Sequence, residues 1–436
     1  MTYNDALRFL SSLIDFERKP SKYDGGIYDP MKVGRMLDTL KVDYKKLKFI
    51  HIAGTNGKGS VALACSLIYS SLGYKTALYT SPHIIRVNER IKTGNIPIED
   101  TDFAGIVEKC KNTVIQNKAT YFETLTLIAI VYFVDTGCDI AVLETGLGGR
   151  LDATNFCIPI VSVITPVSFD HTHILGDTLE KIAREKAGII KADVPVVLSV
   201  QDNEAMRVLC ETALQKNAPL YKFADCVGYT IKSRDINGAV FDMKISVDNT
   251  TITAENIRIP QIGDIFVENF LLSILAVCVS GTKVKKSDIV KVSKMFYNPA
   301  RSQIWKNTMI DISHNVSGLK SLFDTVARYI NRDDICLYIT ALADKDIKSI
   351  GGVIKSDTGR FIRIIAFDFD TGIKTRPSAG YELFACLGNI PNTEYCGDIS
   401  KIELSESKFH IFAGSFYSVA GILKIPYMKN HPLNSG

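Results

Sequence analysis

Short hydrophobic runs alternate with helix-like stretches along most of the first 200 residues. The stretches between the runs carry apolar residues at helical spacing, as residues 61–72 do. Buried parallel strands read as continuous apolar runs and need helices to connect them. The pattern therefore predicts a mostly parallel sheet covered on both faces by helices. Its predicted strands are 48–53, 75–79, 140–144, 160–165 and 194–200.

The pattern changes twice further along the chain. In residues 227–260 polar and apolar positions alternate around Asn237-Gly238, which predicts an antiparallel hairpin. The hydrophobic pattern breaks a second time at Tyr297–Ala300, where we place a linker. Apolar runs then recur with helical stretches between them. We expect an α/β protein with a first domain at 1–296 and a smaller α/β domain at 297–436. Strands of the second domain are predicted at 309–312, 335–340, 363–367 and 410–413.

Composition and charge exclude several classes of protein. The 436 residues carry a net charge of only +4 without a dense basic run, so no footprint for nucleic acid or an acidic membrane surface is expected. The most apolar stretches, 124–134 and 270–280, are far shorter than the roughly 20 residues that a membrane span needs, and they predict buried helices. Ten cysteines without a C-x-x-C pair and a first segment unlike a signal peptide favour a cytoplasmic location.

A glycine-rich segment follows the first predicted strand and opens a helix. In this context backbone N–H groups can cradle phosphate oxygens, Lys58 can bind the outer phosphates, and the hydroxyl of Ser60 can bind magnesium. The standard phosphate-loop pattern is not met, because Ile52 occupies its first glycine position and Gly59 separates Lys58 from Ser60. The alternative is a strand–helix turn without a ligand. The predicted phosphate loop consists of Gly54, Thr55, Asn56, Gly57, Lys58, Gly59 and Ser60.

Two further polar residues follow apolar strands. Glu144 stands at the end of the run 140–144, and ligands of open α/β sheets bind outside the carboxyl ends of strands. A carboxylate there suits magnesium, although it could also cap the following turn. His171 follows Asp170 after another strand. A single histidine is more often a structural hydrogen-bonding group than a metal ligand, and magnesium prefers oxygen.

Several motifs together resemble the folylpolyglutamate synthase/dihydrofolate synthase family of the Mur ligase superfamily. The resemblance implies a Mur-ligase-like ATP-binding domain with a phosphate loop and a central, mostly parallel sheet. It also implies a smaller Rossmann-like C-terminal α/β domain. The motifs are Ala53–Ser60, Ser81-Pro82-His83, Thr120-Tyr121-Phe122-Glu123, Leu143–Asn155, Asp170-His171-Thr172 and Arg184–Gly188.

The resemblance assigns a metal site and a modified lysine. It implies that His171, Glu144 and Ser81 hold a second magnesium ion, beside the one expected at Ser60. On pattern alone Lys186 would be a solvated surface lysine, but the resemblance implies that its amine is carbamylated and helps to organise the metal site. An amine must be neutral to react with carbon dioxide, so burial or nearby cations should lower its pKa.

Residues of the second domain complete the implied nucleotide site. The linker residue Arg301 would reach the phosphates, Asp311 would contact the nucleotide, and His314 would lie near the reacting phosphates. Read without the resemblance, Arg301 is a solvated residue and Asp311 a helix cap. In the first domain, Asn269 matches an adenine-contacting asparagine. Departures from the family pattern are Ile265-Phe266 in place of His-Gln, and Ala300 and Ser302 in place of the glycine and phenylalanine that flank the arginine.

The implied activity is ATP-dependent ligation of L-glutamate to a folate-type carboxylate through an acyl phosphate. Lys58, Lys186, Arg301 and His314 would be the catalytic residues. The expected substrates are ATP, L-glutamate and a reduced folate or dihydropteroate, with Mg²⁺, and the protein is expected to be a monomer. The folate-binding residues would be Thr120, Tyr121, Phe122, Glu123, Leu151, Asp152 and Ala153.

Two other functions are consistent with the motifs. A Mur ligase of peptidoglycan synthesis would use the same chemistry, but it carries an additional domain before the phosphate loop, for which 53 residues leave too little room. A nucleotide-binding regulatory module would bind or hydrolyse nucleotide without regard to glutamate and folate. Phe122 and Tyr121 also have an alternative role, as core residues at the start of an apolar helix.

Overall fold

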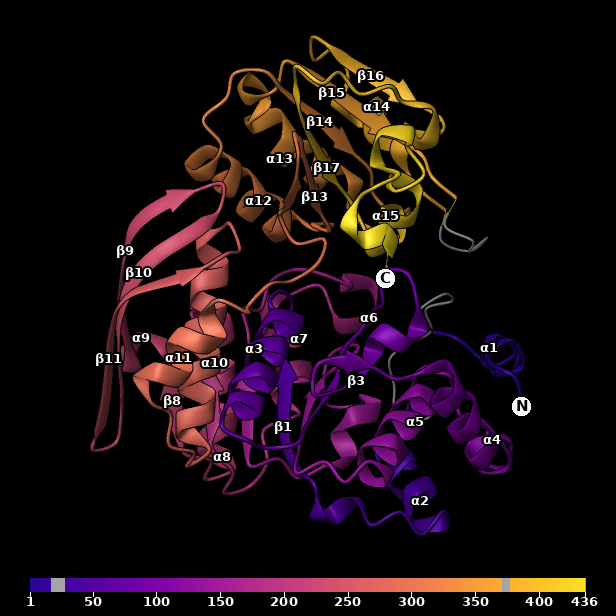
Figure 1. Ribbon diagram of the computed structural model, residues 1–436, viewed down its shortest axis with the longest axis vertical. Coiled ribbons are helices and arrows are strands. Elements are labelled where there is room, and N and C mark those ends of the chain that lie inside the picture. The colour runs from indigo at the N-terminus through magenta and orange to yellow at the C-terminus, as the bar shows by residue number, and fades with distance from the viewer. Residues whose placement is uncertain (17–27, 371–376, 436) are drawn as a thin grey trace. The chain divides into compact units, whose positions relative to one another are not determined.

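The computed structural model describes residues 1–16, 28–370 and 377–435, which form two compact units (Figure 1). Unit 1 consists of Met1–Thr230, Phe241–Arg258 and Glu268–Phe296, and unit 2 of Ile231–Val240, Ile259–Val267 and Tyr297–Gly436. The expected domain boundary between residues 296 and 297 is a change of unit. Two short segments that were expected in the first domain, however, belong to unit 2.

Unit 1 is built on an eight-stranded sheet in the order β4-β3-β2-β5-β1-β6-β7-β8. From β2 to β8 neighbouring strands are parallel, and β3 and β4 add an antiparallel edge. The five predicted strands are all present, which confirms the mostly parallel sheet. The strands are β1 (Lys48–Ala53), β2 (Thr76–Tyr79), β3 (Ile91–Thr93), β4 (Ile96–Pro97), β5 (Ile140–Glu144), β6 (Val161–Ile164), β7 (Val196–Leu198) and β8 (Leu220–Lys222).

Helices cover both faces of this sheet. Phe49 and Leu143 point into a core shared with α4 and α5, while their neighbours Ile50 and Val142 are buried toward the other face. Helix α3 packs on β1, β2 and β5, and α11 packs on α3. The helices are α1 (Tyr3–Ser11), α2 (Lys32–Thr39), α3 (Lys58–Ser71), α4 (Asp100–Gln116), α5 (Tyr121–Asp135), α6 (Thr172–Leu175), α7 (Leu179–Ala187), α8 (Asn203–Gln215), α9 (Phe223–Cys226), α10 (Asp264–Val279) and α11 (Lys286–Ser293).

The two apolar stretches form the helices that were predicted for them. Helix α5 is buried along nearly its whole length, and α10 is a similarly apolar helix that begins in unit 2 and continues in unit 1. Across the described parts of the chain, no helix has both the length and the apolar character needed to cross a membrane.

The predicted hairpin region contains three strands rather than two. The sheet has the order β11-β10-β9, and Gly238 begins β10 with a φ of +118°. A Cβ atom at this position would lie 1.8 Å from the carbonyl oxygen of Ile259, so the turn requires glycine. The strands are β9 (Val227–Asp235), β10 (Gly238–Val247) and β11 (Thr250–Ile259).

Unit 2 contains a six-stranded sheet in the order β12-β13-β17-β14-β15-β16, antiparallel only between β12 and β13. All four predicted strands are present. The sequence pattern missed β12, which has three residues, and β16, whose partly exposed side chains give no apolar run. Its elements are β12 (Gln303–Trp305), β13 (Thr308–Asp311), β14 (Ile335–Ile339), β15 (Arg363–Phe367), β16 (Thr393–Cys396), β17 (Phe409–Ala413), α12 (Val316–Tyr329), α13 (Ile347–Ser356), α14 (Gly380–Leu387) and α15 (Phe416–Ile422).

Candidate active site

The glycine-rich loop joins the central strand β1 to helix α3, as expected. Gly54 has a φ of +146°, and a Cβ atom there would lie 1.8 Å from Oγ1 of Thr165, the residue directly after the neighbouring strand β6. Gly57, with a φ of +88°, ends the loop, and Lys58 is the first residue of α3. Lys58 Nζ donates a hydrogen bond to the Thr55 carbonyl at 3.2 Å. The N–H groups of the first helical turn and this ammonium group lie at the strand end, an arrangement that can bind an anion.

Glu144 lies beside this loop. It pairs with Ile52 in the register of β5 and β1, so both strands end at the same edge of the sheet. The carboxylate is buried, lies 3.9 Å from Lys58 Nζ, and accepts a hydrogen bond of 3.1 Å from the backbone N–H of Ser81. A Cβ atom on Gly59 would lie 3.3 Å from Glu144 Oε2, so the glycine between Lys58 and Ser60 lets the helix approach the carboxylate closely.

The oxygen atoms of this cluster fit a hard divalent cation. The carboxylate of Glu144 and the buried hydroxyl of Ser60 in the first turn of α3 are ligands of the kind that magnesium prefers. Two buried hydroxyls next to the loop, those of Thr145 and Ser168, have no hydrogen-bond partner in the described part of the chain. Within the same residues, no group of three or more His, Cys, Asp or Glu side chains could hold a metal ion.

Lys186 is buried, contrary to the surface position that the helix pattern alone favoured. Its Nζ donates a hydrogen bond of 2.7 Å to the carbonyl of Gly54, the first residue of the phosphate loop. Burial, and then the charge of Lys58, lower the pKa of Lys186 to about 7. The glycine turn after β5 packs against the same helix, since a Cβ atom on Gly149 would lie 3.0 Å from the Lys186 carbonyl oxygen.

His171 follows β6, the other neighbour of β1. Its φ is +50°, its backbone N–H donates to Asp170 Oδ1 at 2.8 Å, and its side chain is partly exposed. Asn269 lies in α10. A Cβ atom on Gly57 would lie 2.7 Å from Asn269 Oδ1, so the amide packs directly on the phosphate loop.

The segment expected to bind folate begins helix α5. Thr120 and Glu123 form a capping box, and Glu123 also forms an ion pair with Lys32 at 3.0 Å. The ring of Phe122 lies over Gly146, where a Cβ atom would come within 2.5 Å of it. Tyr121 is buried, which agrees with the core role weighed for it, whereas Phe122 is only partly buried.

Asp152 organises the glycine turn. Its carboxylate accepts hydrogen bonds of 2.9 Å from the N–H groups of Gly146 and Leu147, and bonds from the N–H and hydroxyl of Thr154. Burial raises its pKa, although each of these bonds acts in the opposite direction. Leu151 and Ala153 on either side are buried. The motif around Asp152 is therefore a tightly bonded turn against which Phe122 packs.

In unit 2, the residues expected near the nucleotide gather around Phe416. The guanidinium of Arg301 lies 5.2 Å from the centre of the Phe416 ring, and the ring of His314 lies 6.5 Å from it. His314 Nδ1 lies 2.8 Å from the Ile312 carbonyl oxygen. Since a carbonyl oxygen can only accept, Nδ1 is the donor of this hydrogen bond. Asp311 accepts hydrogen bonds from the N–H groups of Ser302 and Ser313. No motif pointed to Phe416, which begins α15 and lies far from the linker in the sequence.

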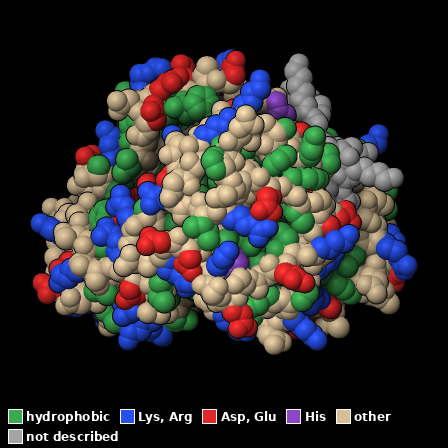
Figure 2. All heavy atoms as spheres, turned by 90° about the horizontal axis from the view of Figure 1, so that it is seen from above, with side chains coloured by type: hydrophobic (Ala, Val, Ile, Leu, Met, Phe, Trp, Pro, Cys, Tyr) green, Lys and Arg blue, Asp and Glu red, His purple; other side chains and the backbone are tan. Residues whose placement is uncertain are grey.

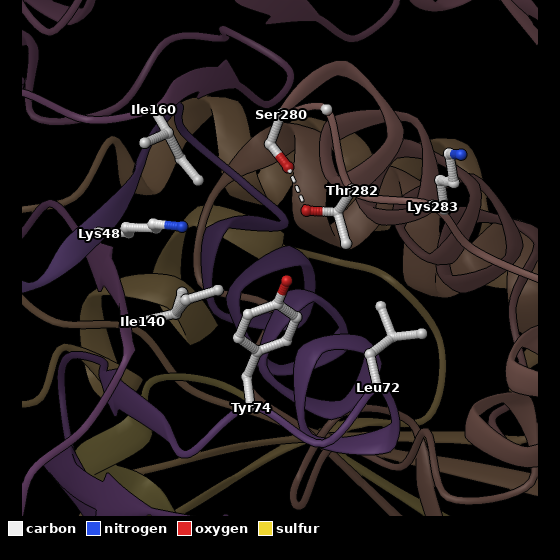
Figure 3. A pocket seen from close by; sticks show the side chains of 9 residues that line it. Lys48, Leu72, Tyr74, Ile140, Ile160, Ser280, Thr282 and Lys283 are labelled. Atoms are coloured by element: carbon white, nitrogen blue, oxygen red, sulfur yellow. Dashed lines mark hydrogen bonds between the residues drawn. The ribbon is translucent and has the colours of Figure 1, made fainter.

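A separate pocket of about 410 Å³ lies at the opposite, amino-terminal ends of β1 and β5. Figure 3 shows the hydroxyl of Tyr74 pointing toward the hydrogen-bonded pair Ser280 and Thr282, with Lys48 at the side. None of the predicted site residues lines this pocket. Since open α/β sheets bind ligands at the carboxyl ends of their strands, the candidate active site is the phosphate-loop edge.

Comparison with known proteins agrees with this assignment. The Mur ligase middle domain family matches residues 52–277. The dihydrofolate synthase/folylpolyglutamate synthase of Bacillus subtilis is 31% identical over 451 residues, covering 97% of this chain and 98% of the relative. The chain belongs to the folylpolyglutamate synthase/dihydrofolate synthase family. It is thus an ATP-dependent ligase, and the resemblance inferred from the motifs is confirmed.

Other relatives of this family extend the comparison. The folylpolyglutamate synthase of Lacticaseibacillus casei is 28% identical over 368 residues, covering 81% of this chain and 84% of the relative. The solved folylpolyglutamate synthase of Thermotoga maritima superposes with a TM-score of 0.80 at 27% identity, covering 100% of this chain and 97% of that one. The Escherichia coli structure with DHPP and ADP shares the fold, with a TM-score of 0.83, 24% identity and 99% of both chains covered.

One departure of this family member from the usual pattern falls where the backbone is left-handed. Ala300 and Ser302, which flank Arg301, have φ values of +56° and +44°. A left-handed conformation costs roughly 1–2 kcal/mol for a residue with a side chain, so the family's usual glycine suits position 300. Ser302 is held by Asp311, which accepts hydrogen bonds from both its N–H and its hydroxyl. The other departure, Ile265-Phe266, starts α10, where Phe266 is buried.

Proposed function

We propose that this protein joins L-glutamate to a folate-type carboxylate by way of an acyl phosphate, with ATP as the phosphoryl donor. The observation that carries the proposal is the convergence of Lys58, Glu144 and the buried Lys186 on one glycine-rich loop. Family membership supports the same reaction. A cytoplasmic location is proposed with it, on the cysteine content described above, and we take the protein to act as a monomer.

The proposed mechanism turns a poor acylating group into a good one. A carboxylate reacts badly with an amine because oxide would have to leave, whereas an acyl phosphate releases phosphate. We propose that Lys58 and the loop N–H groups bind the nucleotide phosphates, and that Arg301 and His314 act on the transferring phosphoryl group. The glutamate amine then displaces phosphate to give the amide. Asn269 and Asp311 are proposed nucleotide contacts.

Magnesium would neutralise phosphate charge when bound. The residues that we propose to hold it are Ser60, Ser81, Glu144, His171 and the carbamate of Lys186. The carboxylate and hydroxyl groups of this set suit the ion, whereas His171 is a less usual ligand for it. The low pKa of Lys186 supports the carbamate, because it leaves a large fraction of the amine neutral near pH 7.

An assay of ADP release tests the function directly. Each of magnesium, L-glutamate and the pterin substrate is omitted in turn, with tetrahydrofolate or dihydropteroate as the acceptor. The ligase reaction requires that ADP release fall to background in every omission. A nucleotide-binding regulatory module would release ADP equally well without glutamate and without any pterin, and that result would exclude the proposal. A peptidoglycan-type ligase would turn over neither acceptor.

We further propose that both acceptors are substrates and that Phe122 contributes to binding their rings. The motivation is the partly buried ring of Phe122 beside the glycine turn, together with Thr120, Glu123 and Asp152. Stacking of aromatic rings contributes about 0.5–1.5 kcal/mol beyond area burial. Phe122→Ala should therefore raise the Michaelis constant of both acceptors roughly 2- to 10-fold.

The matched control for Phe122→Ala is Tyr381→Ala, at an exposed aromatic residue of unit 2. Its Michaelis constants should equal those of the wild type. Turnover of tetrahydrofolate alone would refute two acceptors, and unchanged Michaelis constants in Phe122→Ala would remove the stacking role.

A further inference from the structure

The loop between β2 and β3 is held by two consecutive residues that no motif singled out. Its first part, Ser81 to His83, carries the N–H group that hydrogen-bonds Glu144. Glu89 and Arg90 close the short 3₁₀ helix η2 (Val87–Arg90) directly before β3. Both side chains turn back onto the loop. All of these residues belong to unit 1.

Glu89 holds the second half of the loop by its backbone. Its carboxylate accepts hydrogen bonds from three successive N–H groups, those of Ile84 at 2.7 Å, Ile85 at 2.8 Å and Arg86 at 2.6 Å. Successive N–H groups that converge on one anion form a concave site with strong preference for negative charge. Charge-assisted bonds of this kind are about twice as strong as neutral ones, so the carboxylate fixes the path of residues 84–86.

Arg90 holds the first half of the loop through the side chain of His83. Its Nε donates to His83 Nδ1 at 2.9 Å, and its guanidinium lies 5.7 Å from the centre of the Tyr121 ring. Arg90 is only 2% exposed, although arginine is rarely buried without a specific partner. A guanidinium has no acceptor, so Nδ1 of His83 must be the unprotonated nitrogen. The ring proton of His83 therefore lies on Nε2.

We propose that Glu89 and Arg90 are positioning residues for the ligase reaction. Together they fix the loop 81–86, and through it the N–H of Ser81 against Glu144, while Arg90 links the loop to Tyr121 at the start of the proposed acceptor segment. Neither residue touches substrate in this proposal. It rests on the proposed function for its kinetic consequences, but the tautomer of His83 and the order of the loop follow from the contacts alone.

The expected effects separate the two residues. Arg90→Lys keeps a positive charge but loses the planar guanidinium, so His83 should lose its fixed tautomer. Glu89→Gln should release the amides of Ile84–Arg86. Loss of partners that orient a metal ligand typically costs roughly 10- to 100-fold in metal affinity or activity, and both variants should need correspondingly more magnesium for half-maximal ADP release. The Michaelis constant for the acceptor should rise in Arg90→Lys more than in Glu89→Gln, because only Arg90 lies on Tyr121.

The matched control is Arg86→Ala in the same segment. The Arg86 side chain is exposed, pairs with Asp100 and lies over the Tyr3 ring, and the substitution keeps the backbone N–H that Glu89 holds. It should retain the wild-type magnesium requirement and acceptor constant. Melting temperatures of all three variants identify any that fail to fold, and amide exchange of residues 84–86 is then read in the folded ones.

Two readouts do not depend on ligase turnover. The ¹⁵N chemical shifts of His83 in the wild type should be those of the Nε2–H tautomer and should shift toward a mixture in Arg90→Lys. Amide exchange at residues 84–86 should speed up at least tenfold in Glu89→Gln alone. An Nδ1–H tautomer in the wild type, or unchanged exchange in Glu89→Gln, would overturn the clamp. If both signatures appear in a protein without glutamate-dependent ADP release, the proposed function fails and the clamp stands. Wild-type kinetics in both variants would overturn the positioning role.

Discussion

Lys186 shows how strongly a single side chain depends on its surroundings. Its helix places it toward the sheet, where Nζ bonds to the Gly54 carbonyl and Lys58 lies nearby. Both burial and the second cation disfavour the ammonium form, which brings the pKa to about 7. A neutral amine is the form that reacts with carbon dioxide, so the environment supports the carbamate that the family resemblance implies.

Replacement of Lys186 tests this role. Lys186→Ala should lose most ligase activity and change the melting temperature little, because the buried ammonium was itself costly. A labelled carbonyl signal should appear in the wild type with isotopic bicarbonate and be absent in the variant. It should grow from pH 6 to pH 8 as the amine becomes neutral. Lys181→Ala, at an exposed position on the same helix, is the control and should keep full activity. A fully active wild type without the signal would exclude the carbamate.

At the scale of elements, the turn after β5 packs against two helices, α5 and α7. Asp152 binds its N–H groups, Gly149 lets it approach α7, and Gly146 leaves room for the ring of Phe122 from α5. Each glycine is therefore needed for a close approach rather than for flexibility alone. The density of such contacts explains why the segment from Leu143 to Asn155 carries so specific a sequence.

Gly146→Ala should displace the ring of Phe122. A Cβ atom would lie 2.5 Å from the ring, and a ring is less able to move than the end of a flexible chain. We expect a weaker acceptor affinity and a loss of stability of about 1–3 kcal/mol from overpacking. Gly105→Ala in α4, where a Cβ atom meets nothing within 4 Å, should instead raise stability by about 0.5–1 kcal/mol. Equal behaviour of the two variants in denaturant titrations and acceptor kinetics would contradict this account.

At the scale of the whole molecule, helix α10 contributes residues to both units. Its first residue, Asp264, accepts two hydrogen bonds of 2.8 Å from Arg234, one from Arg328 and one from Tyr329, all within unit 2. Further along, Asn269 packs on the phosphate loop in unit 1.

Charged side chains of both signs are mixed over the face drawn in Figure 2, and no continuous basic patch is seen on that face.

The ion pairs of Asp264 should make stability depend on pH. Burial raises its pKa, but the bonds and charges of Arg234, Tyr329 and Arg328 outweigh burial and hold the pKa below the usual 3.8. A depressed carboxyl pKa adds stability that is present above pH 4 and is lost as the pH falls through the folded-state value. Asp264→Asn should therefore cost on the order of 1–3 kcal/mol at pH 7 and much less at pH 3.

Urea titrations at pH 7 and pH 3 measure the effect. The control is Asp177→Asn, which removes an exposed carboxylate paired only with Lys181 and should change little at either pH. The same loss in Asp264→Asn at both pH values would show that its contribution is not that of an ionised carboxylate.

The sequence by itself determined where the strands and helices of local units lie and which residue types the loop carries. Residues 48–71 specify strand, glycine turn and helix through local geometry, and Glu144 stands at a strand end by pattern alone. Tertiary structure decided the rest. It buries Lys186, brings Arg90 into hydrogen-bond contact with His83, places Arg301 and His314 near Phe416, and adds the edge strand β16. Each of these involves side chains that meet only after distant segments pack, and neither burial nor a hydrogen-bond partner is encoded in a local repeat. Local backbone preference thus fixed the elements, and long-range packing decided which side chains became a site.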